Sequence, residues 1–197
     1  MKKDLIFPAS AIILLLLFAT FQVNAQFNRF GGGLVFNSPM DIITDAASDD
    51  RDFEVGNPGF QLRGVYEIEK KFFIIPSLTF QIPKSKTFTD GSKRTTIFGS
   101  FDIDATYAIA TEKQLLFYAL LGGNVTNIYN SWKTDDPGLE NNYRAAPGVA
   151  IGTGIEMIIE NDINAYAQVK YVLSKYQQLV ITLGVHYYFE GRRYRTW

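Results

Sequence analysis

The sequence contains no cysteine, a single histidine and no excess of basic residues. Without cysteine the chain can form no disulfide, no thiolate metal site and no cysteine nucleophile, and one histidine cannot build a multi-histidine metal centre. A formal net charge of -1 argues against nucleic-acid binding, which needs lysine and arginine to neutralise phosphates. Long apolar runs are missing beyond the N-terminus. This excludes a multi-helix membrane protein, because each helical span needs about 20 mostly apolar residues.

The one long apolar run predicts a cleavable signal peptide over residues 1–25. A positive start at Lys2 and Lys3 precedes the apolar stretch, and the small residues Val23 and Ala25 fit the usual cleavage pattern. We expect cleavage after Ala25 and export of the mature chain. The alternative, an uncleaved membrane anchor, is disfavoured because the apolar run is short.

Apolar and polar residues alternate along most of the remaining chain. In one such segment, Leu62 and Ile68 alternate with Arg63 and Glu67. Successive residues of a β-strand point to opposite faces, so a period of two predicts strands with one apolar and one polar face. The pattern is clear in residues 60–69, 97–109, 163–173 and 179–189, and weaker in 28–37, 72–82, 115–129 and 147–159.

The connections between these eight predicted strands alternate in length. We expect long loops at 40–57, 84–94 and 131–146, a shorter one at 174–178, and tight turns near Lys70, 111–114 and 160–162. Long loops on one side and short periplasmic turns on the other are typical of transmembrane barrels. The sequence therefore predicts an all-β fold, an eight-stranded antiparallel up-and-down transmembrane β-barrel over residues 26–189.

A soluble barrel also has alternating strands, so the polarity of the two faces has to decide. A water-soluble barrel packs its apolar residues inward, and a soluble periplasmic lipid-binding barrel therefore stays an alternative. The aromatic residues favour the membrane, because on the apolar face they gather near both ends of the strands, as at a membrane–water interface. Tyr107 and Tyr187 lie toward the short turns, and Phe60 and Tyr171 toward the long loops.

The segments RFGGGLVFN, PGVAIGTGIEMII and ITLGVHYYF, in this order, resemble the PorT-like outer membrane β-barrel domain proteins of Bacteroidota. Their architecture is similar to that of OmpA- and OmpX-type barrels. The resemblance implies an outer-membrane location and a last strand that carries the signal for the outer-membrane assembly machinery, with Gly184, Tyr187 and Phe189 at the matching positions. Residues 190–197 depart from the family, whose barrels usually end at the terminal aromatic residue. A longer last strand would place Arg193 and Arg195 against lipid, so we expect these residues to form a short basic periplasmic tail.

The polar face points into a lumen that, in an eight-stranded barrel, is just wide enough for side chains to fill. Isolated charges there are costly, so we expect them to pair across the lumen, with Lys170 and Glu156 as one pair on adjacent strands. A closed lumen is favoured, and a small porin-like channel stays an alternative. The predicted luminal polar network comprises Arg29, Arg63, Glu67, Asp102, Asp104, Glu156, Lys170 and His186.

An enzymatic use of the lumen is disfavoured. His186, an aspartate such as Asp102 or Asp104, and Ser100 are the residue types of a nucleophilic triad. A filled lumen, however, offers a substrate no pocket. We predict that the protein is not an enzyme and has no catalytic, metal or cofactor site.

The loops are the remaining candidate surface. Residues 41–57 carry six acidic residues against one arginine, but their spacing does not fit an EF-hand calcium loop. Lys84, Lys86, Lys93 and Arg94 make the segment 84–94 basic, which suggests contact with the phosphates of lipopolysaccharide.

The sequence thus predicts a non-enzymatic outer-membrane protein with a structural or interaction role. Envelope integrity, surface adhesion, and assembly or secretion all fit such a barrel. The expected partners are outer-membrane lipid, including lipopolysaccharide, the outer-membrane assembly machinery and an unidentified envelope protein. No nucleic-acid partner is expected.

Overall fold

The structure, a computed structural model, describes residues 27–39, 58–88, 91–112, 114–133, 141–160 and 162–188. Its strands are β1 (Phe27–Pro39), β2 (Pro58–Glu69), β3 (Phe72–Gln81), β4 (Lys84–Thr87), β5 (Lys93–Glu112), β6 (Leu115–Lys133), β7 (Asn142–Glu160), β8 (Ile163–Ser174) and β9 (Gln178–Tyr188). The residues described contain no helix of the length and apolarity needed to cross a membrane.

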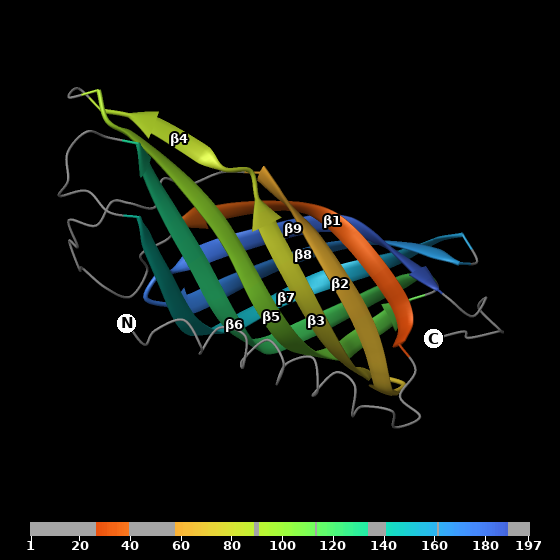
Figure 1. Ribbon diagram of the computed structural model, residues 1–197. Helices are drawn as coiled ribbons and strands as arrows, with labels where there is room; N and C mark the ends of the chain where they lie inside the picture. Colours follow the sequence, from red (N-terminus) through yellow and green to blue (C-terminus); the bar gives the residue numbers. More distant parts are fainter. Residues whose placement is uncertain are drawn as a thin grey trace.

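The strands close into an antiparallel barrel (Figure 1). Except for β3 and β4, strands next to each other in the chain pair with each other, and β1 pairs with β9. The wall is completed by β3 and β5, which pair from Phe72 opposite Tyr107 to Phe80 opposite Gly99. Eight strands form the wall, and the short β4 lies against β5 beyond the end of β3. The predicted eight-stranded up-and-down barrel is confirmed.

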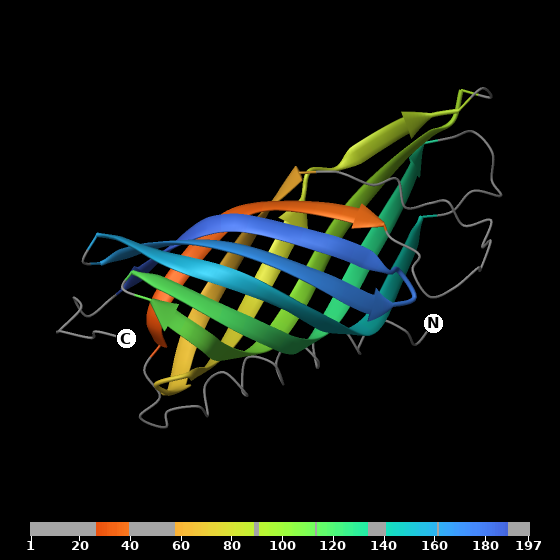
Figure 2. The same ribbon diagram turned by 180° about the vertical axis from the view of Figure 1, so that it is seen from behind.

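The short connections gather at one end of the barrel, as predicted. They join β2 to β3, β5 to β6 and β7 to β8, each with only two residues between the strands. Figure 2, seen from behind, shows the β5–β6 and β7–β8 turns at the same end. We call this end the turn end and the opposite one the outer end.

The segment 84–94 was predicted to be a loop, and this prediction is wrong for Lys84–Thr87, Lys93 and Arg94, which lie in strands. Lys84–Thr87 forms β4 and pairs with Lys93–Thr96 of β5, so that β4 and the outer ends of β5 and β6 project past the rest of the wall (Figure 1). Pro83, which has no N–H to donate, separates β3 from β4. The alternation missed this extension because its residues are polar on both faces.

The two faces of the wall have opposite chemistry. Large apolar side chains cover the outside, among them Phe60 at 58%, Leu121 at 59% and Ile109 at 63% exposure. Neighbouring residues along the strands, such as Gln61 beside Phe60 and Asn124 beside Val125, are buried in the lumen. This arrangement fits contact with lipid outside and contradicts a soluble barrel, which packs its apolar side chains inward.

Glycines in β1 and β9 make room for a luminal aromatic ring. Gly33 lies opposite Gly184, and both lie against Tyr166. A Cβ atom on Gly184 would lie 2.7 Å from Tyr166 Cζ, and one on Gly33 would lie 2.9 Å from Tyr166 Oη. The glycine-rich first strand therefore has a packing role, and so does Gly184 besides its predicted part in the assembly signal.

Several predicted segments lie outside the described residues. They are the signal peptide 1–25, the acidic segment 41–57, Phe189 and the tail 190–197. The other aromatic residue of the predicted assembly signal, Tyr187, is described and is 54% exposed on the outside of β9.

If the outer face contacts lipid, a charged substitution on that face should destabilise the protein more at mid-membrane than near the membrane surface. Leu183 lies midway along β9 with half its surface exposed, whereas Leu179 lies on the same face at the outer end. We expect Leu183→Arg to lower the free energy of unfolding by about 2–4 kcal/mol and Leu179→Arg by about 0–1 kcal/mol. Urea titration of the protein folded into lipid vesicles measures both values. Equal losses in the two variants would contradict the assignment.

Candidate functional site

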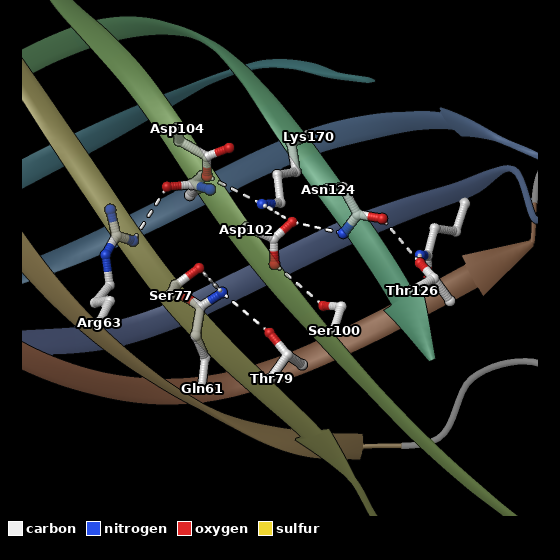
Figure 3. Close-up of polar contacts among 12 residues, drawn as sticks. Gln61, Arg63, Ser77, Thr79, Ser100, Asp102, Asp104, Asn124, Thr126 and Lys170 are labelled. Atoms are coloured by element: carbon white, nitrogen blue, oxygen red, sulfur yellow. Dashed lines mark hydrogen bonds and ion pairs between the residues drawn. The ribbon is translucent and has the colours of Figure 1, made fainter. Parts of the chain in front are cut away.

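A buried ion cluster joins opposite sides of the lumen. The Lys170 Nζ on β8 donates hydrogen bonds to Asp102 Oδ1 at 2.9 Å and to Asp104 Oδ2 at 3.0 Å, both on β5. All three side chains are at most 2% exposed. In the wall β5 and β8 are separated by β6 and β7, so this cluster ties strands that share no backbone hydrogen bond (Figure 3).

A chain of hydrogen bonds runs from this cluster toward the outer end. Asn124 donates to Asp102 Oδ1 at 2.7 Å, and Thr126 donates to Asn124 at 2.8 Å (Figure 3). Gln178 in turn donates to Thr126 at 3.3 Å and accepts from Asn37 at 2.7 Å. The chain therefore links β5, β6, β9 and β1 in one connected network.

A second ion pair lies toward the turn end. Arg29 on β1 pairs with Glu156 on β7, across β9 and β8. Asn164 donates to the same carboxylate, and His186 Nδ1 lies 3.4 Å from Glu156 Oε2. The His186 ring is stacked on Tyr166 with 4.4 Å between the ring centroids.

Between the two ion pairs lies Arg63 on β2. Its guanidinium donates to Gln168 Oε1 at 3.1 Å and stands 4.2 Å from the centre of the Tyr166 ring. Tyr118 donates to the same Gln168 oxygen at 3.2 Å. A cation over an aromatic face is stabilised by the ring quadrupole. This contact helps to offset the cost of burying the Arg63 charge.

The remaining lumen is filled by apolar side chains. One cluster, near the turn end, comprises Val65, Phe73, Ile75, Ala108 and Leu116, and the other comprises Val35, Ala150, Val172 and Val180. The charged members of the lumen are three cations and three carboxylates that are at most 5% exposed, namely Arg29, Arg63, Lys170, Asp102, Asp104 and Glu156. Balanced charge and low exposure describe a closed interior in which Arg29 and Lys170 pair with carboxylates and Arg63 contacts Gln168 and Tyr166.

A second candidate surface is the part of the sheet that projects at the outer end. We call residues 84–88, 91–96 and 130–133 the outer ridge. Its inner face continues the lumen side of β5. There Phe88 and Trp132 are stacked at 5.4 Å, and the Arg94 guanidinium stands over both rings at 5.6 and 5.5 Å. The Lys86 Nζ lies 5.7 Å from the Phe88 ring, so the inner face combines cations with aromatic rings.

The family described as outer membrane protein beta-barrel domain matches residues 10–189. The chain belongs to this family. It is an outer-membrane β-barrel, and the soluble lipid-binding alternative is wrong. No protein with a curated description matches the chain significantly.

Solved structures of small outer-membrane barrels share the fold of this family member. Ail, the attachment invasion locus protein of Yersinia pestis, is 15% identical with a TM-score of 0.56 over 83% of this chain and 100% of Ail. The N-terminal barrel of Pseudomonas aeruginosa OprF is 14% identical, with a TM-score of 0.56 over 84% of this chain and 100% of that domain. Neisserial surface protein A is 16% identical, with a TM-score of 0.55 over 84% of this chain and 99% of its own.

The structure of this family member places seven of the eight predicted luminal residues in the buried interior. The eighth, Glu67, is half-buried and accepts a hydrogen bond from Asn28 at 2.7 Å. The predicted pairing of Lys170 with Glu156 is wrong, because each finds its partner across the lumen instead. The alternation along a strand predicts whether a side chain points into the lumen. It does not predict which strand supplies its partner.

Residues of the suggested triad belong to different groups in the barrel. His186 contacts Glu156 and Tyr166, whereas Ser100 donates to Asp102 at 3.1 Å. The described residues contain no group of three or more histidine, aspartate or glutamate side chains arranged to hold a metal ion. Asn37 and Gln178 were not among the predicted luminal residues, although both lie at strand positions whose side chains point inward and are hydrogen-bonded to each other.

The ion cluster predicts a large cost for removing its cation. Lys170→Met leaves the carboxylates of Asp102 and Asp104 buried without the cation that pairs with both, and we expect it to lower the free energy of unfolding by about 3–5 kcal/mol. The triple variant Lys170→Met/Asp102→Asn/Asp104→Asn should recover most of this loss, because no unpaired charge remains. Urea titration in lipid vesicles measures both. If the single variant lost less than about 1 kcal/mol, a value usual for exposed pairs, the cluster would not hold the lumen together.

Proposed function

We propose that this outer-membrane barrel is a non-enzymatic, non-conducting surface protein that adheres to polyanionic glycans through its outer ridge. The observation that carries the proposal is the filled lumen, because it leaves the two ends of the barrel as the surfaces available for function. At the outer end, β4 pairs with the extended end of β5, which in turn pairs with the end of β6.

The lumen supports the non-conducting part of the proposal. A water or ion path would have to pass Arg63, Lys170 and Asp102, whose exposure is 1–2%. Opening it would break ion pairs that are costly to separate in a buried site. The small-porin alternative would need this network to come apart in the folded state.

The outer ridge supports the adhesive part. Lys84 and Lys86 are exposed on its inner face, beside the stacked Phe88 and Trp132. Cations next to aromatic rings suit sulfated or phosphorylated sugars, since the cations bind the anionic groups and the rings pack against the sugar faces. Ail, which shares the fold, has been crystallised with the heparin analogue sucrose octasulfate. The assembly or secretion role implied by the PorT-like resemblance stays a prediction.

The closed lumen predicts that the protein does not conduct ions. The purified barrel, inserted into planar lipid bilayers, should give no stable openings over hours of recording. Flotation with lipid vesicles and heat-dependent migration in gels verify that the same preparation is inserted and folded. Uniform, long-lived conductance steps in that preparation would favour the porin instead.

The ridge predicts a localised loss of glycan binding. Lys84→Gln/Lys86→Gln should weaken binding to immobilised heparin by roughly tenfold, because each exposed charge pair contributes up to about 1 kcal/mol. The matched control, Lys70→Gln/Lys71→Gln at the β2–β3 turn, removes the same charge from the other end and should bind as the wild type does. If both variants bound heparin more weakly, the effect would be due to net charge alone. If neither did, the proposed adhesive surface would be refuted.

A larger deletion tests the whole β4 hairpin. Replacing residues 83–96 by Asn-Gly keeps Ile82 in register with Ile97, because Phe80 lies opposite Gly99. This variant should fold as the wild type does and bind heparin at least as weakly as the double variant does.

A further inference from the structure

The outer face of the outer ridge carries two lysines directly opposite each other. Lys93 of β5 and Lys133 of β6 are paired in register, and both are exposed. Alternation places them on the face opposite Arg94 and Trp132, the face that continues the lipid-facing side of the wall. The structure therefore divides the basic segment 84–94 between two faces, and it adds Lys133 from outside that segment to the outer one.

This lysine pair stands at a defined height above the apolar band. The last large apolar and aromatic residues on the same face are Ile97 and Tyr129, which pair in register and are 45% and 39% exposed. Four residues further along each strand is about 13 Å, or about 9 Å along the membrane normal at a strand tilt of about 45°. The headgroup layer is about 5–8 Å thick on each side of a bilayer, and lysine stems can bend back toward it.

The residues between these two levels are hydroxyl-bearing. Thr95 pairs with Ser131 on β6 and with Ser85 on β4, and the Ser85 and Thr95 hydroxyls are 2.8 Å apart. From the apolar band outward, the face therefore presents aromatic, then hydroxyl, then cationic side chains. This order matches the change from acyl chains through the polar boundary to the charged headgroups of a membrane.

Two like charges directly opposite on neighbouring strands destabilise a sheet unless an anion lies between them. Among the described residues no ion pair joins Lys93 or Lys133 to a carboxylate. A phosphate group between the two ammonium groups would remove the repulsion and accept charge-assisted hydrogen bonds from both.

We infer that Lys93 and Lys133, with the hydroxyls of Thr95 and Ser131 below them, bind the phosphate groups of lipopolysaccharide in the outer leaflet. This site is independent of the proposed glycan-binding face, because it uses other residues on the opposite side of the same strands. It anchors the ridge to the membrane surface and leaves the inner face free for a partner.

The test compares two double variants of the full-length barrel in a zwitterionic detergent. Binding of fluorescent lipopolysaccharide should weaken about 25-fold in Lys93→Gln/Lys133→Gln, because each lysine near an anionic surface contributes a factor of about five. The matched control, Lys70→Gln/Lys71→Gln at the β2–β3 turn, removes the same charge from the other end of the barrel and should change binding by less than about twofold, a value typical of surface changes away from a site. Heat-dependent gel migration shows that both variants fold.

Two further arms identify the source of the phosphate. Lipopolysaccharide stripped of its phosphates should bind the wild type and Lys93→Gln/Lys133→Gln equally weakly, and inorganic phosphate at millimolar concentration should not displace the intact glycolipid. Equal binding by the wild type and this variant would overturn the inference, as would equal losses in the two double variants. Displacement by inorganic phosphate would assign the pair to free phosphate and overturn the lipid assignment.

Discussion

The buried contact of Lys170 with Asp102 and Asp104 is the constraint on which the rest of this barrel depends. Eight strands enclose a lumen that side chains must fill, and a charge placed there needs a partner because water cannot reach it. The cluster meets this need across the barrel and so couples β5 to β8. Arg29 and Glu156 do the same for β1 and β7, and together they set how the walls face each other.

Because side chains fill the lumen, binding to other molecules has to use the exterior of the barrel. Over most of the wall the exterior contacts lipid, so the ends of the strands carry the groups that can meet other molecules. The outer ridge differs from an ordinary surface loop because paired strands hold its side chains at fixed spacing and on fixed faces. One short sheet can therefore present Lys84 and Lys86 to one side and Lys93 and Lys133 to the other.

Features that follow from a local rule could be predicted from the sequence, whereas features that depend on contacts between distant strands could not. Alternation assigned Arg63, Asp102 and Lys170 to the lumen, since the side-chain period of a strand is independent of its neighbours. It mispaired Lys170 with Glu156, because proximity was judged between adjacent strands. It also treated Lys84–Thr87 as loop, because strands beyond the membrane need no apolar face and so lose the period-two signal.

The sequence by itself determined the strand number, the order of turns and loops and the division into a lipid-facing and a luminal face, because each follows from alternation and from connection length. Only the tertiary structure decided which charges meet, that Tyr166 packs against Gly33 and Gly184, and that the outer strands continue as a ridge. The physical reason is that these contacts depend on the stagger and closure of the barrel, which bring together residues from strands that are not neighbours in the chain.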